Sequence, residues 1–315
     1  MGKNKIPLLI LFIVSILGGI ILLPAPKAEA VQADATLTVT NSLPVGSSVS
    51  IDAAAASVTL TEATTATVTA TFTVTDNNGC DDIDSHISND TVAVFFRTNV
   101  AGGAACTPDD ANCYSMSCGA KAGCTPGGSD LTATFSCTAD VQFYADATDA
   151  GATYEANDWT ATATPRDSAG TDGTPSSDTI EMDSLTALSA TASITYGALA
   201  LGADTATTDQ TTVITNTGNR QIDAQVDGYG AEDGDGKSMA CTIGTVSIEL
   251  EKYDISASTA YASKTALSDT AATITAFNLA QGASSTKDIY WGMGLPETGV
   301  GGSCTGKVNF TATNG

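Results

Sequence analysis

Alternation of threonine with apolar residues is the feature that most limits the folds open to this chain. From Thr65 to Thr75 every odd position is threonine, and every even position is alanine, valine or phenylalanine. A period of two places the apolar residues on one face of a strand and the hydroxyl groups on the other. Threonine is β-branched and suits the solvated face. The segment therefore predicts a β-strand with one buried face.

Similar alternating runs recur along the chain, and clusters of Gly, Asn and Asp separate them. The runs cover residues 91–97, 131–144, 160–164, 190–196, 211–215, 245–250, 272–279, 287–293 and 308–312. No long pattern of helical period follows residue 30. Many short strands with regular turns are typical of antiparallel sandwiches. We therefore expect an all-β protein of two tandem Ig-like antiparallel β-sandwiches after an N-terminal signal helix.

The first thirty residues have the layout of an export signal. Lys3 and Lys5 precede an apolar run over residues 6–23, and Ala28 and Ala30 form an A-x-A cleavage pattern. We expect cleavage after Ala30 and export through the Sec pathway to the cell surface or the medium. The alternative is an uncleaved membrane anchor, because the run is near the lower length limit for a spanning helix. Both interpretations export everything after residue 30.

The cysteines agree with export. There are eight of them, an even number, which in an exported chain predicts four disulfides. None has the C-x-x-C spacing typical of zinc sites. The six cysteines of the first half allow 15 pairings, and short local loops are the simplest choice. The expected pairs are Cys80–Cys137, Cys106–Cys113, Cys118–Cys124 and Cys241–Cys304.

A loop rich in Gly, Ser, Thr and Asp over residues 167–178 precedes a boundary that we place near residue 185. The expected parts are a signal peptide (1–30), an N-terminal strand or linker (31–55), a disulfide-rich β-sandwich (56–184) and an Ig-like β-sandwich (185–315). Each half contains one tryptophan, Trp159 or Trp291. Both are expected to be core residues, and carbohydrate stacking is the alternative.

Residues 35–40, Ala-Thr-Leu-Thr-Val-Thr, also alternate, but Pro44, Gly46 and a run of alanines separate them from the first sandwich. One interpretation is a strand that folds onto its own domain. The other is a donor strand that adds to the open edge of a neighbouring subunit and builds a filament.

The second half carries a resemblance to a known class of modules. Its signature stretches are residues 193–202, 212–219, 289–296 and 302–312. Their pattern of strand and turn residues resembles that of the Ig-like sandwich modules of prokaryotic surface proteins and of secreted TasA-like filament subunits. The resemblance implies export, a surface location and self-assembly or adhesion, and it implies no catalytic residues. Gly218 is expected to provide a left-handed turn position, and Pro296 to end a strand or lie at an edge.

Charge and motifs exclude several classes of function. The net charge of −23 is incompatible with binding nucleic acid through phosphate contacts. The single histidine, His86, lies in a polar stretch, and no G-x-S-x-G motif occurs, so we expect no enzyme. Residues 295–299 match the sorting signal that sortases cleave. Only 16 residues follow, with no hydrophobic span, and we interpret them as a strand that holds Cys304.

Acidic loops are the candidate metal sites. Four residues after the strand at 65–75 offer oxygen ligands suited to calcium: Asp76, Asn78, Asp82 and Asp84. Two further pairs, Asp146 with Asp149 or Asp167 with Asp172, are candidates for the same end of the sandwich. A second cluster lacks EF-hand spacing and contains Asp227, Glu232, Asp233 and Asp235. The alternative for both clusters is a solvated turn of an acidic protein.

These features together predict a non-enzymatic exported structural protein of the cell surface, an envelope component or a filament subunit. Its expected partners are other surface subunits or copies of itself. The alternative is a surface adhesin or glycan-binding module that uses Trp159 or an exposed tyrosine such as Tyr144. Nucleic acid is not an expected partner, and a membrane is one only through an uncleaved N-terminal segment.

Overall fold

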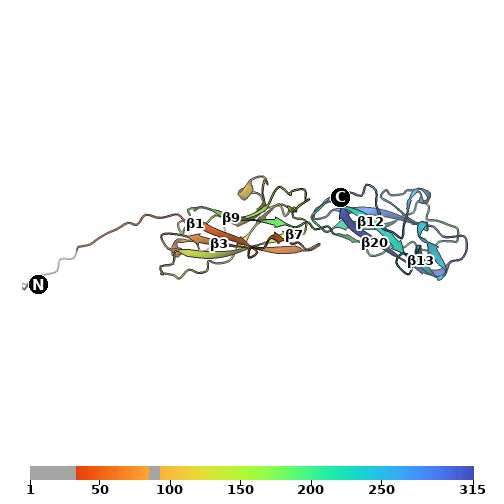
Figure 1. Ribbon diagram of the computed structural model, residues 1–315, viewed down its shortest axis with the longest axis horizontal. Coiled ribbons are helices and arrows are strands. Elements are labelled where there is room, and N and C mark those ends of the chain that lie inside the picture. The colour runs from red at the N-terminus through yellow and green to blue at the C-terminus, as the bar shows by residue number, and fades with distance from the viewer. Residues whose placement is uncertain (1–32, 85–92) are drawn as a thin grey trace, which may run out of the picture. The chain divides into compact units, whose positions relative to one another are not determined.

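The computed structural model describes residues 33–84 and 93–315, and these residues form β-strands joined by loops and short 3-10 turns (Figure 1). The chain divides into two compact units, residues 1–40 and 41–315, and all described strands belong to the second. The 3-10 turns are η1 (Cys80–Asp82), η2 (Gly103–Ala105), η3 (Ile248–Leu250) and η4 (Tyr261–Ser263). The all-β class is thus confirmed, whereas the expected signal helix lies outside the described residues.

The first half contains two sheets that share one core. One sheet has the order β1-β3-β7-β6 and consists of β1 (Val45–Ile51), β3 (Thr65–Thr75), β7 (Thr132–Gln142) and β6 (Ser117–Cys118). The other has the order β2-β9-β8-β4-β5 and consists of β2 (Ser57–Val58), β9 (Ser176–Met182), β8 (Trp159–Ala163), β4 (Ala93–Arg97) and β5 (Cys113–Ser115). All pairings are antiparallel except the short β2–β9 pair.

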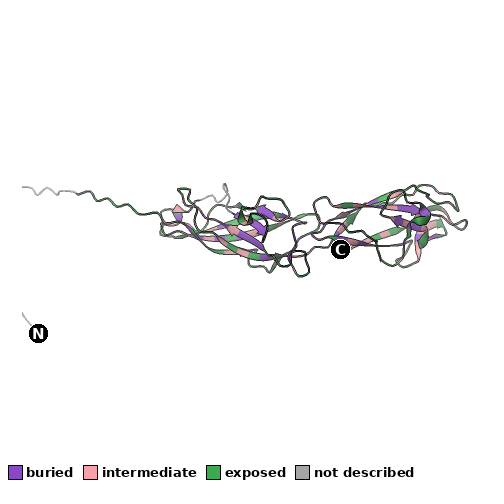
Figure 2. Cartoon of the chain, turned by 90° about the horizontal axis from the view of Figure 1, so that it is seen from above, coloured by how far each residue is buried: buried purple, intermediate pink, exposed green. Residues whose placement is uncertain are grey.

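Strand β3 behaves as its sequence predicts. It pairs with β7 along its whole length, and Phe72 lies opposite Phe135. Its apolar positions Val68, Ala70 and Phe72 are fully buried, and the intervening threonines face outward. Figure 2 shows buried residues alternating with more exposed ones along such strands. The alternating pattern therefore decides which face of the sheet is turned to the core. The apolar side chains of both sheets form one core cluster.

The second half is built from three sheets. The largest has the order β10-β11-β18-β15-β16, with β10 (Leu188–Ala190), β11 (Gln210–Asn216), β18 (Thr286–Met293), β15 (Glu251–Asp254) and β16 (Thr265–Ala266). A second has the order β17-β12-β20, with β17 (Ala272–Thr273), β12 (Ile222–Tyr229) and β20 (Lys307–Asn314). The third has the order β14-β13-β19, with β14 (Thr245–Ser247), β13 (Lys237–Ile243) and β19 (Gly301–Thr305).

Each half has its own core with one tryptophan at its centre. Trp159 is fully buried, stacks on Phe95 at 4.9 Å between ring centroids, and donates its indole N–H to the carbonyl of Asp146 at 2.8 Å. Trp291 is fully buried in a separate core cluster, where its ring packs edge-on against Phe310. Both tryptophans are core residues, as predicted.

All eight cysteines are paired, but two of the four predicted pairs are wrong. The predicted pairs Cys106–Cys113 and Cys241–Cys304 are present. Instead of Cys80–Cys137 and Cys118–Cys124, the bonds are Cys80–Cys124 and Cys118–Cys137. The reason is strand register, since β6 pairs with β7 so that Cys118 lies directly opposite Cys137. Proximity in sequence does not reveal that pairing.

Four predicted strands differ in the structure. The strand predicted over residues 245–250 is reduced to β14 and followed by the η3 turn, and the one predicted over 272–279 is reduced to the two residues of β17. Residues 35–40 are assigned to no strand, and the first strand, β1, begins only at Val45 and pairs with β3. The strand predicted over residues 190–196 is reduced to β10, and residues 191–199 follow without strand pairing. An alternating segment is able to form a β-strand. It does so only where the edge of a neighbouring strand supplies backbone hydrogen bonds.

Gly218 is needed for close packing rather than for a left-handed turn. A Cβ atom at this position would lie 2.0 Å from the carbonyl oxygen of Leu185, and Gly218 is absent from the described glycines with positive φ. The neighbouring Asn219 accepts the Leu185 N–H at 2.6 Å and donates to the carbonyl of Asp183 at 3.0 Å. The 216–219 turn thus binds the segment that joins the two cores.

Candidate functional site

The acidic loop after β3 contains a carboxylate that is buried. Asp76 is 1 % exposed, and its Oδ1 accepts the N–H of Asn78 at 2.8 Å. Its Oδ2 is also buried and has no hydrogen-bond partner among the described residues. Burial raises the pKa of Asp76, and the nearby negative charges of Asp82 and Asp167 raise it further. The charges of Asp82 and Asp167 thus act on Asp76 through electrostatics rather than through a shared contact.

Hydrogen bonds join this loop to the loop that follows β8. Ser168 donates its hydroxyl to Oδ1 of Asp82 and its backbone N–H to the carbonyl of Asp82. The N–H of Asp84 is bonded to the carbonyl of Arg166, and Ile83 forms a β-bridge with Asp167. Asp167 is fully buried. The structure thus brings Asp167 to the predicted cluster of Asp76 and Asp82.

The other residues suggested for this end of the sandwich have different partners. Asp146 forms an ion pair with Arg97 Nε at 2.8 Å and accepts Gln281 Nε2 at 2.8 Å. Asp149 accepts the hydroxyl of Ser184, and Asp172 pairs with Arg166. Asn78 is exposed, and its Oδ1 accepts the N–H of Ser42. Of the two suggested pairs, only Asp167 lies in a loop bonded to that of Asp76 and Asp82, and the oxygens of these three described carboxylates do not all lie within 4.8 Å of one another.

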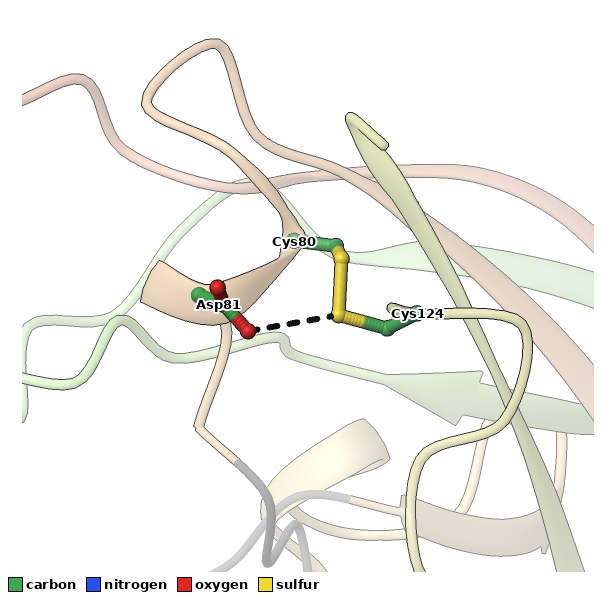
Figure 3. Close-up of side chains that lie close together, drawn as sticks. All are labelled: Cys80, Asp81 and Cys124. Carbon is green, nitrogen blue, oxygen red and sulfur yellow. Dashed lines mark hydrogen bonds between the residues drawn. A yellow bond between two sulfur atoms is a disulfide. The ribbon is translucent and has the colours of Figure 1, made fainter. Parts of the chain in front are cut away.

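Cys80, Asp81 and Cys124 also lie close together, as Figure 3 shows. The two sulfur atoms form a disulfide, so neither is a thiolate that can bind a metal ion. A carboxylate oxygen of Asp81 lies 3.8 Å from Cys124 Sγ, and its other oxygen accepts the N–H of Gly127. This group is a covalent link between two loops, and its carboxylate organises the 124–127 turn.

The second acidic cluster is a turn held by one aspartate. The carboxylate of Asp235 accepts the backbone N–H groups of Ala231 and Lys237 at 2.8 Å, and those of Gly230 and Glu232 at longer distances. These N–H donors lower the pKa of Asp235 to about 2. Asp227 accepts the side-chain amide of Asn309. The geometry matches the interpretation of this cluster as a solvated turn.

Carbohydrate stacking by the tryptophans is excluded by their burial, since neither ring reaches the surface. Tyr144 is half-buried and packs edge-on against Phe143 at 5.0 Å. The adhesin hypothesis named Trp159 and Tyr144, and of these two only Tyr144 keeps an accessible surface. His86 lies outside the described residues.

The edge of β20 is an open surface of the second half. β20 pairs with β12 from Lys307 to Asn314, and no described strand pairs with its other edge. Val308, Phe310 and Ala312 point toward the core but are only partly buried. A cavity of about 310 Å³ lies beside this edge. Its lining is mixed, with the apolar side chains of Ile194, Met239, Val308 and Phe310 beside polar and charged ones such as Ser193, Glu251 and Lys307.

A second cavity, of about 450 Å³, shares lining residues with the first. Residues 191–194 line the first cavity and residues 194–199 line the second, and Met239 and Cys304 border both. Residues 192–199, which are assigned to no strand, therefore border two cavities of mixed polar and apolar lining. β19 and β20 follow the sortase-like motif at 295–299, so cleavage there would remove two strands that carry this surface.

A buried acid borders the first cavity and was not predicted from the sequence. Glu251 is 2 % exposed, and one of its carboxylate oxygens accepts the hydroxyl of Tyr196 at 2.6 Å. Burial raises the pKa of Glu251 to about 7, although the Tyr196 hydrogen bond opposes the shift. The residue lies in a Glu-Lys-Tyr-Asp stretch whose alternation places Glu251 and Tyr253 on the buried face.

The chain matches no family model and no curated protein sequence. Among the residues that the structure describes, no helix is long and apolar enough to cross a membrane. The four disulfides are consistent with an extracellular protein.

Proposed function

We propose that this protein is a non-enzymatic structural subunit of the cell surface, exported by its N-terminal signal and assembled into filaments from copies of itself. The observation that carries the proposal is the exposure of Leu37 and Val39, which are 89 and 72 % exposed within an alternating segment. Exposed apolar side chains at alternate positions are the pattern of a strand that lacks a partner.

The proposed acceptor is the open edge of β20 in a second copy. An added strand gains main-chain hydrogen bonds at a free edge, and its alternate side chains enter the adjacent apolar space. Leu37 and Val39 are two residues apart, so they face the same side of a strand. The cavity lined by Ile194, Val308 and Phe310 offers apolar contacts for them. The four disulfides would hold the subunit rigid as strands are exchanged.

The resemblance of residues 186–315 to Ig-like modules of prokaryotic surface and filament proteins supports the same proposal. The two separate cores, each covered by β-sheets, agree with a pair of sandwich-like modules. The adhesin alternative depends on Tyr144 and Phe143, which keep part of their surface accessible.

The test is assembly of the chain beginning at residue 31, followed by electron microscopy and by the concentration at which fibres form. Replacing Leu37 and Val39 with serine removes two apolar side chains from the proposed junction. Burying each is worth roughly 1.5 kcal/mol or more, so the critical concentration is expected to rise about a hundredfold.

The matched control is Thr36→Ser with Thr38→Ser, which changes the opposite face of the same segment and is expected to leave assembly intact. A synthetic peptide of residues 33–42 is expected to block fibre growth, and its Leu37→Ser/Val39→Ser version is not. A chain that stays monomeric at high concentration, or fibres that persist in the Leu37→Ser/Val39→Ser variant, would refute the proposal.

A further inference from the structure

Residues 192–199 of the second half have few hydrogen bonds to the rest of the protein. Just before them, the N–H of Thr191 donates to the carbonyl of Val213 at 3.1 Å. Just after them, the N–H of Gly202 donates to the carbonyl of Pro296 at 3.1 Å. Between these points no backbone group of residues 192–199 bonds to another described residue. A segment with so few hydrogen bonds needs little free energy to open.

One side-chain hydrogen bond holds the middle of this segment. The hydroxyl of Tyr196 donates to a carboxylate oxygen of Glu251 at 2.6 Å. Glu251 lies on β15 and is 2 % exposed. Ile194 and Tyr196 are two residues apart, and both pack against the core of the second half. Tyr196 is therefore the residue that attaches the segment to the sheet below it.

The same segment forms one wall of both cavities described above. Residues 191–194 and Glu251 border the cavity of about 310 Å³, and residues 194–199 and Met293 border the cavity of about 450 Å³. Met293 is 2 % exposed. Displacing the segment would open both cavities to solvent, and water would then reach Glu251 and Met293.

The charged and titratable groups on the elements around Glu251 have other partners or lie in solvent. They are Lys252 and Tyr253 on β15, Glu249 on η3, Tyr261 on η4, Lys264 before β16 and Lys307 on β20. Lys264 pairs with Asp209 at 2.8 Å, and the Lys252 ammonium lies over the ring of Tyr261. Glu249 and Lys307 are exposed. Among the described residues, Tyr196 is the hydrogen-bond partner that the structure gives the Glu251 carboxylate.

The proton on Glu251 favours the covered state of the segment. Burial raises the pKa of Glu251 to about 7, and the Tyr196 hydrogen bond opposes that shift. Burial also raises the pKa of Tyr196, so its hydroxyl stays protonated at neutral pH. A covered carboxyl binds its proton more tightly than an exposed one. The covered state is therefore favoured most below pH 4.5, and it becomes less favourable as the pH rises through 7.

We propose that residues 192–199 are a flap held shut by the bond from Tyr196 to Glu251, and that ionisation of Glu251 opens it. The open flap exposes Met293 and widens the space beside the free edge of β20. An ionised carboxylate is more stable in water than under an apolar cover, which supplies the free energy for opening.

Opening of the flap takes place within one chain and does not rest on the proposed function. Only its role in admitting a strand from a second copy does so. The flap is therefore studied in the Leu37→Ser/Val39→Ser variant of the chain beginning at residue 31, which is expected to stay monomeric. The flap and the filament can then fail separately.

The experiment measures the rate at which hydrogen peroxide oxidises Met293 to the sulfoxide, by peptide mass spectrometry at pH 5, 6, 7 and 8. The rate is expected to rise at least about tenfold from pH 5 to pH 8, because one unit of pKa difference is a tenfold change in the opening equilibrium. Met182, fully buried in the first half, is the internal reference and is expected to keep its rate. Glu251→Gln is expected to remove the rise, and the control Glu249→Gln, at an exposed position, to retain it.

A second variant and a second condition separate the flap from unfolding of the whole half. Tyr196→Phe keeps the ring but removes the hydroxyl, and is expected to oxidise Met293 roughly fivefold faster at pH 5, the effect of one lost hydrogen bond. Adding about 1 M urea is expected to leave the rate nearly unchanged, because local opening exposes little surface. A rate that ignores pH, a rise that survives Glu251→Gln, an unchanged rate in Tyr196→Phe, or a rate that follows global unfolding in urea would each overturn the proposal.

Discussion

Removing the disulfide between Cys241 and Cys304 is expected to lower the unfolding free energy of the second half by about 4 kcal/mol. The bond closes a loop with a sequence separation of 63 residues, and in the chain-entropy model the stabilisation grows with the length of that loop. The two cysteines lie opposite each other on β13 and β19, so the bond also holds β19, which leads directly into β20, against β13.

Differential scanning calorimetry of the Cys241→Ala/Cys304→Ala variant measures this loss. The matched control is Cys106→Ala/Cys113→Ala, which opens a loop with a separation of only 7 residues and is expected to cost about 2 kcal/mol. If the short-loop variant loses as much stability as the long-loop variant, the loop-closure explanation is wrong.

The stability of the second half is expected to fall as the pH rises from about 4.5 to 7, because of Glu251. Its pKa is 4.5 in an ordinary environment and is raised to about 7 by burial. A folded state with the higher pKa binds the proton more tightly than the unfolded state does. Its contribution is therefore fully present below pH 4.5 and is lost as the pH rises through 7, a change of about 3 kcal/mol.

Urea unfolding at pH 4.5, 6, 7 and 8 tests this expectation when wild type is compared with Glu251→Gln. The difference between the two isolates Glu251 from the general repulsion within an acidic protein. Glutamine keeps an oxygen for the Tyr196 hydroxyl, so the variant is expected to gain on the wild type as the pH rises. Glu249→Gln is the control, since Glu249 is exposed and its pKa is lowered, not raised. A difference that stays flat across the range for Glu251→Gln would contradict the assignment.

Local patterns predicted the strands whose alternation uses threonine. β3 spans the predicted residues 65–75, and β7 (Thr132–Gln142) falls within the predicted 131–144. β12 was not predicted, although Ile222, Ala224 and Val226 alternate with Asp and Gln there and are all buried. Asp and Gln are weaker strand formers than Thr, and pairing with β20 outweighs that preference.

The carboxylate cluster was predictable only in part. Asp76 and Asp82 are close in sequence, and a turn after a strand is a natural place for oxygen ligands. Asp167 is about ninety residues farther along the chain, and only the β-bridge between Ile83 and Asp167 brings it to the cluster. From the sequence, Asp146 was as good a candidate for this cluster as Asp167. In the structure Asp146 forms an ion pair with the buried Arg97 instead.

The amino-acid sequence alone determined the all-β class, the tryptophan in each core and the pairing of all eight cysteines within the chain. These features follow from the alternation of apolar residues, from side-chain size and from composition, which can all be read without knowing which distant segments meet. Tertiary structure decided which cysteines join, which carboxylates converge and which strand edge stays open. Those outcomes depend on register and on loop closure between distant segments, where a shift of one residue moves every side chain to the other face.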